Sequence, residues 1–274
     1  MSLDYHGLFG LSALTNQYEY GNSRQFLSIV NQELGLFMTD HKSRSEYIIF
    51  TGVDGQTFRR DFLNRDGPAD FETYSITHQL ILFKMESHTH GIAHRSFDHM
   101  LHDKLRDMGN GDRQIRPFGS AHVQGEERKK RADESYQPNR LPRHRSNHWP
   151  SLVVEVGYSE VQRKLESDVA WWSTESAGDV RAVITIAVDP RVKRMIICQW
   201  HGTNMVYRNV LSRPYGGRMQ NTNSNPLVIE FDRLFLRAPQ GIEANITFTI
   251  DELGEFAELV WEIEFEGQVS GDSS

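Results

Sequence analysis

The pattern of apolar and polar positions along the chain predicts a mixed α/β protein. Three segments carry apolar residues at helical spacing and are predicted to be helices: 25–37, 92–108 and 159–173. Four short apolar runs predict strands: 80–85, 152–158, 180–188 and 194–200. The runs at 152–158 and 180–188 are apolar almost throughout, which is typical of central strands buried on both faces.

Shorter sequence patterns predict the remaining strands, loops and the last helix. Asp54-Gly55 stands between the apolar runs 47–50 and 57–62 and predicts a hairpin. The remaining assignments are strands at 117–123 and 131–136, a long loop at 207–225 and a last strand pair within 227–236. A final helix is predicted from Thr249, because Glu252 three residues later completes a capping box.

These elements predict one α/β domain with additions at both ends. The core is expected over 80–205, and an N-terminal elaboration of a helix and a hairpin, 1–79, is expected to pack on it. A loop, strands and a helix are expected over 206–266, and residues 267–274 are expected to form a disordered tail.

Composition narrows the class of protein. The chain has 274 residues and a single cysteine, Cys198, which excludes an intrachain disulfide framework and a cysteine-rich zinc module. It has no apolar run of about 18 residues, and its first residues lack the basic-then-apolar order of a signal peptide. We therefore expect an intracellular protein, nuclear or cytoplasmic, that is neither secreted nor inserted in a membrane.

Charge is distributed unevenly along the chain. The net charge of −7 by itself argues against a nucleic-acid partner. Residues 113–145, however, hold nine Lys or Arg and four Asp or Glu, whereas the chain from residue 227 onward holds eleven acidic residues and two arginines. The basic segment is either a strip that contacts phosphates or a solvated loop that happens to be basic, and the charge pattern leaves both open.

Glu155 is the most informative residue of the sequence. It lies in the middle of the apolar run 152–158, and a carboxylate buried there costs several kcal/mol unless a partner compensates its charge. Asp133 lies on the preceding predicted strand, and two carboxylates that meet beside adjacent strands repel each other until a divalent cation binds between them. An all-oxygen ligand set favours Mg²⁺ or Mn²⁺. The alternative is that Glu155 pairs with an arginine and Asp133 lies in a turn.

Lys164 and Asp168 lie one turn apart on the predicted helix that follows Glu155. A lysine beside two metal-binding carboxylates can orient a water molecule or stabilise charge that develops during phosphodiester hydrolysis. The alternative is a surface ion pair, which contributes at most about 0.5 kcal/mol to stability.

Several phrases of the sequence resemble a known superfamily. The order helix, three strands, helix, strand, with an aspartate on the second strand and a glutamate in the third, resembles the core of the PD-(D/E)XK nucleases. The phrases KMESHTHGIAHRSFDHMLHDKL, ADESYQP, WPSLVVEVGYSE and KLESDVAWW are similar to an uncharacterised fungal family akin to the Uma2-like restriction-endonuclease-fold proteins. The resemblance covers roughly residues 80–200. It implies an α/β fold with a restriction-endonuclease-like core and a mixed central sheet.

The resemblance also implies roles for individual residues. Asp133 matches the aspartate of the superfamily motif, although Ala132 replaces the proline before it. Glu155 matches the second acidic residue of the motif. Gly157 stands where the motif has its lysine, and Lys164 on the following helix is the candidate replacement.

The first core helix departs from the family pattern. Gly91 stands where related sequences place a glutamate after the histidine, so that ligand is missing. His90 and His94 lie four positions apart and are the candidate site residues on this helix, although both could equally face solvent.

The resemblance implies an endonuclease that depends on Mg²⁺ or Mn²⁺ and hydrolyses DNA, with RNA as a second candidate substrate. In this interpretation Asp133 and Glu155 hold the metal, and Lys164 acts beside them. The basic residues expected to hold the nucleic-acid backbone are Arg128, Lys129, Lys130, Arg131, Arg140, Arg143 and Arg145.

Gly91 and Gly157 keep a second interpretation open, namely a catalytically degenerate protein of the same fold that binds nucleic acid or a protein partner without cleavage. A third interpretation is an interaction protein that uses its acidic C-terminal helix. The apolar stripe of that helix, which includes Phe256 and Trp261, would pack on the core or form a homodimer.

Overall fold

The chain folds into two compact units. The computed structural model describes residues 4–40, 44–63, 71–118, 122–158, 162–215 and 217–269. The first unit comprises Met1–Ser87 and Ser120–Ala132, and the second comprises His88–Gly119 and Asp133–Ser274. The boundary between the N-terminal unit and the core thus lies after Ser87, whereas the sequence analysis placed it after residue 79. The segment Ser120–Ala132, which was expected in the core, belongs to the first unit.

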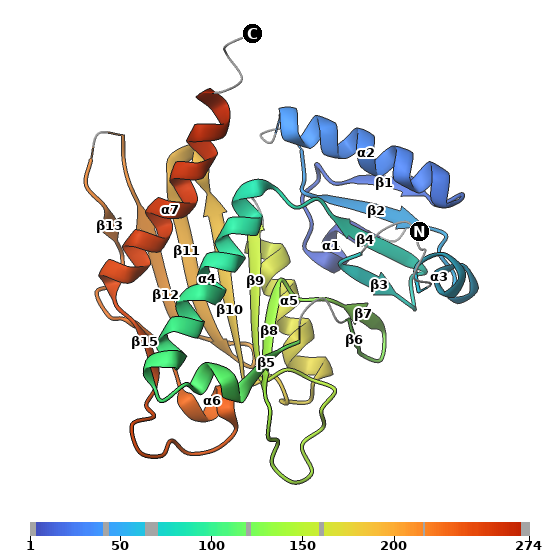
Figure 1. Cartoon of the computed structure of the whole chain (residues 1–274). Coiled ribbons are helices and arrows are strands. Elements are labelled where there is room, and N and C mark those ends of the chain that lie inside the picture. The colour runs from blue at the N-terminus through green and yellow to red at the C-terminus, as the bar shows by residue number, and fades with distance from the viewer. Residues whose placement is uncertain are drawn as a thin grey trace. The chain divides into compact units, whose positions relative to one another are not determined.

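The first unit is built on a six-stranded sheet in the order β1-β2-β4-β3-β7-β6 (Figure 1). Its strands are β1 (Asn16–Glu19), β2 (Tyr47–Thr51), β3 (Thr73–Ser75), β4 (Leu80–Lys84), β6 (Val123–Gln124) and β7 (Arg128–Lys130). Its helices are α1 (Tyr5–Phe9), α2 (Ser23–Thr39) and α3 (Gly55–Asp61). Helix α2, which was predicted from its apolar spacing, buries Phe26 against Phe50 of β2, with ring centroids 4.5 Å apart.

The hairpin predicted around Asp54-Gly55 is wrong. Strand β2 pairs with β4, and the second predicted hairpin strand is helix α3. Asp54 is the N-cap of that helix, because its carboxylate accepts a hydrogen bond from the Thr57 backbone N–H at 2.7 Å. Aspartate followed by glycine suits a helix start as well as a tight turn, and the burial of Phe58 in α3 favours the helix.

The second unit is built on a seven-stranded sheet in the order β13-β12-β11-β10-β9-β8-β5. Its strands are β5 (Ile115–Pro117), β8 (Glu134–Pro138), β9 (Leu152–Tyr158), β10 (Ala182–Asp189), β11 (Arg194–His201), β12 (Asn204–Ser212) and β13 (Gln220–Asn221). A separate two-stranded sheet consists of β14 (Leu227–Ile229) and β15 (Ile246–Phe248). Its α-helices are α4 (His88–Asp107), α5 (Gln162–Glu175), α6 (Phe231–Phe235) and α7 (Ile250–Val269), and its short 3₁₀ helices are η1 (Gly111–Gln114) and η2 (Pro190–Val192).

The topology of this unit confirms the predicted fold class. Helix α4 is followed by β5, β8 and β9, then by α5 and β10, which is the predicted order of helix, three strands, helix and strand. Strands β9 and β10 are parallel and are joined through α5, whereas β8 runs antiparallel to both β5 and β9. The unit therefore has a restriction-endonuclease-like α/β core with a mixed sheet.

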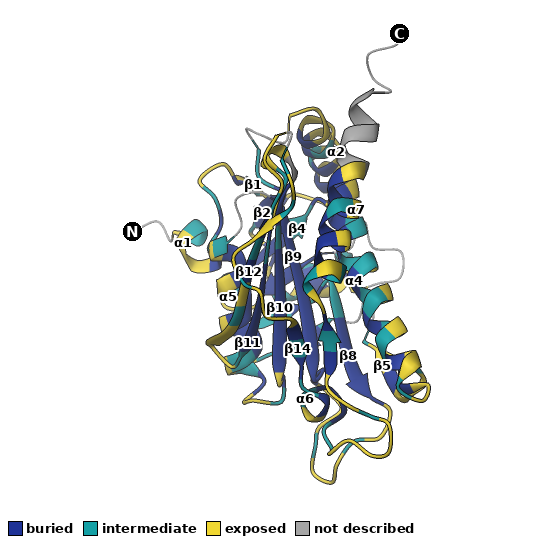
Figure 2. Ribbon diagram, turned by 90° about the vertical axis from the view of Figure 1, so that its left-hand side faces the viewer, coloured by how far each residue is buried: buried dark blue, intermediate teal, exposed yellow. Residues whose placement is uncertain are grey.

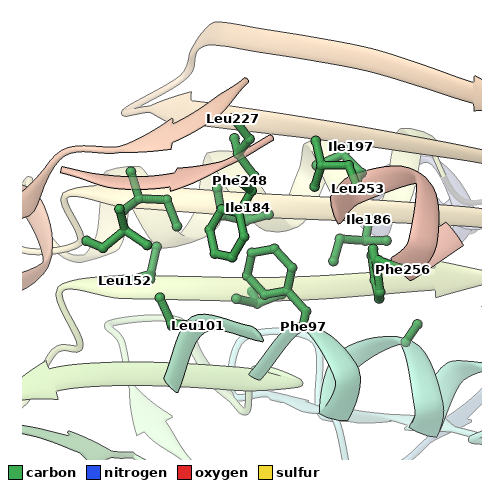
Figure 3. Packing of buried hydrophobic residues seen from close by; sticks show 14 of the residues in the cluster. Phe97, Leu101, Leu152, Ile184, Ile186, Ile197, Leu227, Phe248, Leu253 and Phe256 are labelled. Carbon is green, nitrogen blue, oxygen red and sulfur yellow. The ribbon is translucent and has the colours of Figure 1, made fainter. Parts of the chain in front are cut away.

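The core of the second unit lies between the sheet and helices α4 and α7. Figure 3 shows Phe97 and Leu101 of α4 beside Leu152 and Ile184 of the sheet, with Phe248 of β15 close by. Strand β9 is buried at every position, its neighbours β8 and β10 are buried at all positions but one each, and Figure 2 shows these strands dark blue along most of their length. Complete burial of an apolar side chain contributes about 1.5–3 kcal/mol, so this layer fixes the positions of α4, β8 and β9 relative to one another.

Two predictions about strands before β9 are corrected by the structure. The strand predicted at 117–123 ends at Pro117, and residues 119–121 lie outside the described residues. The strand predicted at 131–136 begins only at Glu134, so Asp133 precedes β8 rather than lying on it.

Predictions for the C-terminal part also need correction. The predicted loop 207–225 contains most of β12 and all of β13, because β12 pairs with β11 along its length. The segment 227–236 holds one strand, β14, followed by α6, and the partner of β14 is β15. Helix α7 has the predicted capping box, with the Glu252 carboxylate 2.8 Å from the Thr249 backbone N–H, and it extends to Val269 through part of the expected tail. Residues 270–274 lie outside the described residues, and no helix of the described part is long and apolar enough to cross a membrane.

Phe97→Ala is predicted to lower the free energy of unfolding by about 3–5 kcal/mol, because it leaves a cavity beneath α4. Urea unfolding followed by circular dichroism measures this change. The control is Arg95→Ala, an exposed position on the same helix, which is expected to change stability by less than about 0.5 kcal/mol. Equal effects of the two substitutions would contradict the packing of α4 on the sheet.

Candidate active site

The pairing of β8 with β9 brings Asp133 and Glu155 to the same level of the sheet. Glu134 pairs with Val154 and Ser135 with Val153, so one further step of this antiparallel register places Asp133 opposite Glu155. The Asp133 carboxylate also accepts a hydrogen bond through Oδ2 from the backbone N–H of Val156, at 2.6 Å. Asp133 is therefore held against the residue that follows Glu155, which is the proximity that the sequence analysis expected.

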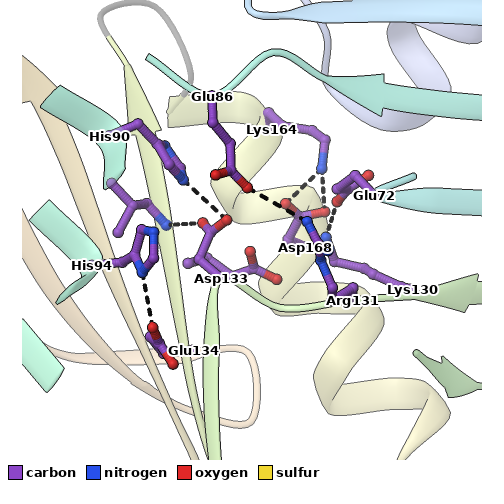
Figure 4. Close-up of polar contacts among 12 residues, drawn as sticks. Glu72, Glu86, His90, His94, Lys130, Arg131, Asp133, Glu134, Lys164 and Asp168 are labelled. Carbon is purple, nitrogen blue, oxygen red and sulfur yellow. Dashed lines mark hydrogen bonds and ion pairs between the residues drawn. The ribbon is translucent and has the colours of Figure 1, made fainter. Parts of the chain in front are cut away.

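Helix α4 adds two histidines to this site. His90 is 1% exposed, and its Nε2 lies 3.1 Å from Asp133 Oδ1. His94 Nδ1 lies 2.8 Å from Glu134 Oε1 (Figure 4). Because an ionised carboxylate only accepts hydrogen bonds, each imidazole donates through an N–H in this arrangement. His90 and His94 therefore orient the start of β8. The alternative interpretation, in which both histidines face solvent, is wrong.

Glu155 has a hydrogen-bond partner that the sequence did not reveal. The carboxylate is 2% exposed, and its Oε1 accepts a hydrogen bond from the indole Nε1 of Trp172 at 2.6 Å. Trp172 lies on α5 and is completely buried. A buried hydrogen-bond acceptor needs such a donor. Trp172 follows Glu155 by 17 positions, and helix α5 places its indole beside the Glu155 carboxylate.

Lys164 and Asp168 form a buried ion pair on α5. The Lys164 Nζ donates to both carboxylate oxygens of Asp168, each at 2.6 Å. Their side chains are 1% and 6% exposed, so the pair is not the surface ion pair that the sequence allowed as an alternative. Loss of one partner from a buried pair is strongly destabilising, since the remaining charge stays in a poorly solvated place.

The ligand chemistry of the site suits a hard divalent cation bound by few protein groups. Within the described residues no group of three His, Cys, Asp or Glu side chains is arranged to hold a metal. Mg²⁺ is commonly bound through one or two carboxylates, with water and substrate phosphates completing its shell. An ionised carboxylate offers about four lone-pair sites, so a carboxylate that accepts hydrogen bonds can also serve as a metal ligand. The residues fit Mg²⁺ or Mn²⁺ held by Asp133 and Glu155, and not a preformed zinc site.

The basic residues of the first unit are largely engaged within that unit. Lys130 is 1% exposed and forms an ion pair with Glu72, which leaves no surface for a phosphate and corrects its assignment to nucleic-acid binding. Arg131 lies 3.4 Å from a carboxylate oxygen of Glu86. Arg128 lies over the Phe9 ring, 4.4 Å from its centroid. Lys129 is half-buried in β7.

The basic residues after β8 do not flank the carboxylates. Arg140, Arg143 and Arg145 follow the end of β8, and its five residues at about 3.3 Å each separate them from Asp133 by more than about 15 Å along the strand. Arg145 donates to the Asp179 carboxylate at 2.6 Å and to four backbone carbonyls within the loop and beyond it. Burial lowers the pKa of its guanidinium, and the neighbouring Asp179 opposes this effect. Arg145 therefore holds the loop together and is not offered to a ligand at Asp133.

Comparisons with known proteins add little to this geometry. No family model matches the sequence, and no curated protein matches it. Among solved structures, one match is a "putative nuclease belonging to DUF820" from Anabaena variabilis, with 12% sequence identity and a TM-score of 0.39. The match covers 68% of this chain and 90% of the other. We assign no residue or activity of this chain from that likeness.

Lys164→Met is predicted to destabilise the protein by about 3–5 kcal/mol, because it leaves the Asp168 charge buried without its lysine. The double variant Lys164→Met/Asp168→Leu is expected to recover most of this loss, since it removes both charges. Urea unfolding of the two variants and the wild type measures the effect. A single variant as stable as the wild type would show that the pair is solvated.

Proposed function

We propose that the protein is a metal-dependent nuclease that hydrolyses phosphodiester bonds, with DNA as its substrate. The observation that carries the proposal is the hydrogen bond from the Val156 backbone N–H to Asp133, which holds one carboxylate beside the strand position next to Glu155. The Asp133 side chain is 8% exposed and lies beside the strand that carries the buried Glu155, so two carboxylates in this part of the sheet need compensating positive charge or a shared proton. A divalent cation satisfies that need and also supplies the chemistry of phosphodiester hydrolysis.

The residues around the two carboxylates have separate roles in this proposal. Asp133 and Glu155 would hold Mg²⁺ or Mn²⁺, which would supply a Lewis acid for a phosphoryl oxygen and a lowered pKa for bound water. His90 and Trp172 are positioning residues, because each donates a hydrogen bond that fixes one oxygen of a metal-binding carboxylate. Lys164 donates hydrogen bonds to both carboxylate oxygens of Asp168 and is proposed to stabilise negative charge on the reacting phosphate.

A catalytically degenerate protein of the same fold is the second candidate. Gly157 and Gly91 occupy the positions at which the resembled superfamily has a lysine and a glutamate. The described residues also lack a third carboxylate or histidine in a metal cluster with Asp133 and Glu155. Such a protein would bind nucleic acid without cleaving it, and its affinity would fall steeply with salt concentration.

Glu155→Gln and Asp133→Asn are each predicted to weaken Mn²⁺ binding at least tenfold, because each removes one of two charged ligands. Isothermal titration calorimetry with MnCl₂ measures the affinity, and circular dichroism checks that the variants remain folded. Cleavage of plasmid and single-stranded DNA with Mg²⁺ or Mn²⁺ is expected to disappear in both variants.

The matched control for these variants is Asp189→Asn. Asp189 is also a buried carboxylate of the same sheet, but it pairs with Arg191 at 2.9 Å at the far end of β10. It is expected to leave Mn²⁺ affinity and cleavage unchanged. Wild-type affinity in Glu155→Gln would refute the metal site, and cleavage that persists in Asp133→Asn would place the reaction elsewhere. Salt-sensitive DNA binding without metal binding or cleavage would favour the degenerate protein.

Gly91→Glu is predicted to strengthen Mn²⁺ binding several-fold. A Cβ at Gly91 would meet no heavy atom of a neighbouring residue within 4 Å, so the helix has room for a side chain there. The added carboxylate would stand next to His90, which contacts Asp133. Gly91→Ala is the control: it is expected to raise stability by about 0.5–1 kcal/mol through helix propensity and to leave Mn²⁺ affinity unchanged. Equal Mn²⁺ affinities for the two variants would contradict a site beside His90.

A further inference from the structure

Two adjoining hollows lie at the end of the second unit where β8 leads into β9. One has a volume of about 630 Å³ and is lined by the loop after β8, the start of β10 and the α6 region. The other has a volume of about 680 Å³ and is lined by η1, the end of β8 and the chain after α6. Figure 1 shows α6 and the β8–β9 loop at the same end of the sheet. Arg237 lines both hollows, and the two together are called here the arginine groove.

The charge of the arginine groove is opposite to that of the whole protein. Seven arginines and three carboxylates line it, and none of its lining residues is a lysine. The chain as a whole carries a net charge of −7. Arg113, Arg140, Arg143 and Arg145 belong to the basic segment 113–145, whereas Arg181, Arg233 and Arg237 come from later parts of the chain, and only the fold brings the two groups together. Guanidinium groups bind phosphate oxygens in a bidentate manner, which lysine ammonium groups cannot do.

Four of these arginines are available to a ligand. Arg113, Arg140, Arg143 and Arg181 are exposed. Within the described part of the chain, none of their guanidinium groups makes a hydrogen bond or an ion pair. Seven arginines against three carboxylates leave an excess of positive charge in the groove, which is unfavourable, and Arg181 also lowers the pKa of the nearby Arg145. An anion in the groove would remove this repulsion.

The other arginines hold the walls of the groove in place. Arg237 donates to both carboxylate oxygens of Glu243 at 2.6 Å, and its guanidinium lies over the Phe231 ring. Arg233 donates to the backbone carbonyl of Arg181 at 3.1 Å, which ties α6 to the start of β10. Arg233 and Arg237 thus hold the walls of the groove in place before a ligand binds, so binding does not have to pay for ordering them.

We infer that the arginine groove binds the phosphodiester backbone of a nucleic acid. The open shape and the exposed guanidinium groups of both hollows suit a ligand with anions repeated along its length, and a nucleic-acid strand carries one phosphate about every 3.4 Å of helix axis. The groove is separate from the carboxylate site, because Glu155 lies three residues, about 10 Å, along β9 from the strand end that the groove adjoins. The inference does not depend on cleavage.

Fluorescence anisotropy with a labelled duplex oligonucleotide, in EDTA so that cleavage cannot occur, tests the groove. Arg143→Gln/Arg181→Gln is expected to bind about tenfold more weakly or worse than the wild type at moderate salt. The slope of log affinity against log salt concentration is expected to become less steep by about two, one unit for each lost phosphate contact. The control Arg208→Gln/Arg218→Gln removes the same charge at exposed positions outside the groove and is expected to bind like the wild type.

Three results would overturn the inference that the arginine groove binds a nucleic-acid backbone. The first is an equal salt slope for Arg143→Gln/Arg181→Gln and the control. The second is binding of inorganic phosphate, measured by calorimetry, as tight as that of the oligonucleotide, which would indicate a site for a free phosphate. The third is an unaltered oligonucleotide affinity in both double variants. Asp133→Asn and Glu155→Gln are expected to retain binding in EDTA, so failure of the nuclease proposal and failure of the groove give different results.

Discussion

A carboxylate buried in a central strand is the constraint on which the second unit depends. Glu155 occurs where β9 is apolar on both sides, and burial without partners would cost several kcal/mol of a folding free energy that is typically about 5–15 kcal/mol. The fold meets this cost through contacts from outside the strand. Helix α5 returns the indole of Trp172 to the carboxylate, and the β8–β9 pairing places Asp133 opposite Glu155, one register step beyond the Glu134–Val154 pair. The same elements that compensate the buried charge therefore assemble the candidate active site.

The second unit separates its acidic and basic chemistry along the strands. The carboxylates, the histidines of α4 and the Lys164–Asp168 pair occur around the start of β8, the middle of β9 and helix α5. Four exposed guanidinium groups that make no hydrogen bond or ion pair within the described residues, those of Arg113, Arg140, Arg143 and Arg181, line the hollows around the other end of β8. This separation explains how an acidic protein can present a surface for phosphates. It also explains why a basic segment next to Asp133 in the sequence does not mark a basic active site in space.

Local signals in the sequence predicted several elements correctly. The apolar run 152–158 is β9 at its predicted ends, and the capping box of Thr249 and Glu252 begins α7. These predictions succeeded because the deciding interactions lie within a few residues of each other. The hairpin at Asp54-Gly55 failed because the same dipeptide caps a helix, and the choice depends on burial of Phe58 in the first unit. Strand β12 was missed because its polar composition suits a loop, and only its pairing with β11 makes it a strand.

The sequence by itself determined the helix–strand order of the core, the need of Glu155 for a partner, and the nearness of His90 and His94 on one helical face. Only the tertiary structure decided which groups meet that need. Trp172, the Val156 backbone N–H and the opposing histidines are separated from their carboxylates by 17 to 43 residues, and their contacts follow from strand register and helix packing. The arginine groove is likewise a product of the fold, because electrostatic repulsion and attraction depend on distance in space, and Arg113, Arg143, Arg181 and Arg237 are remote along the chain.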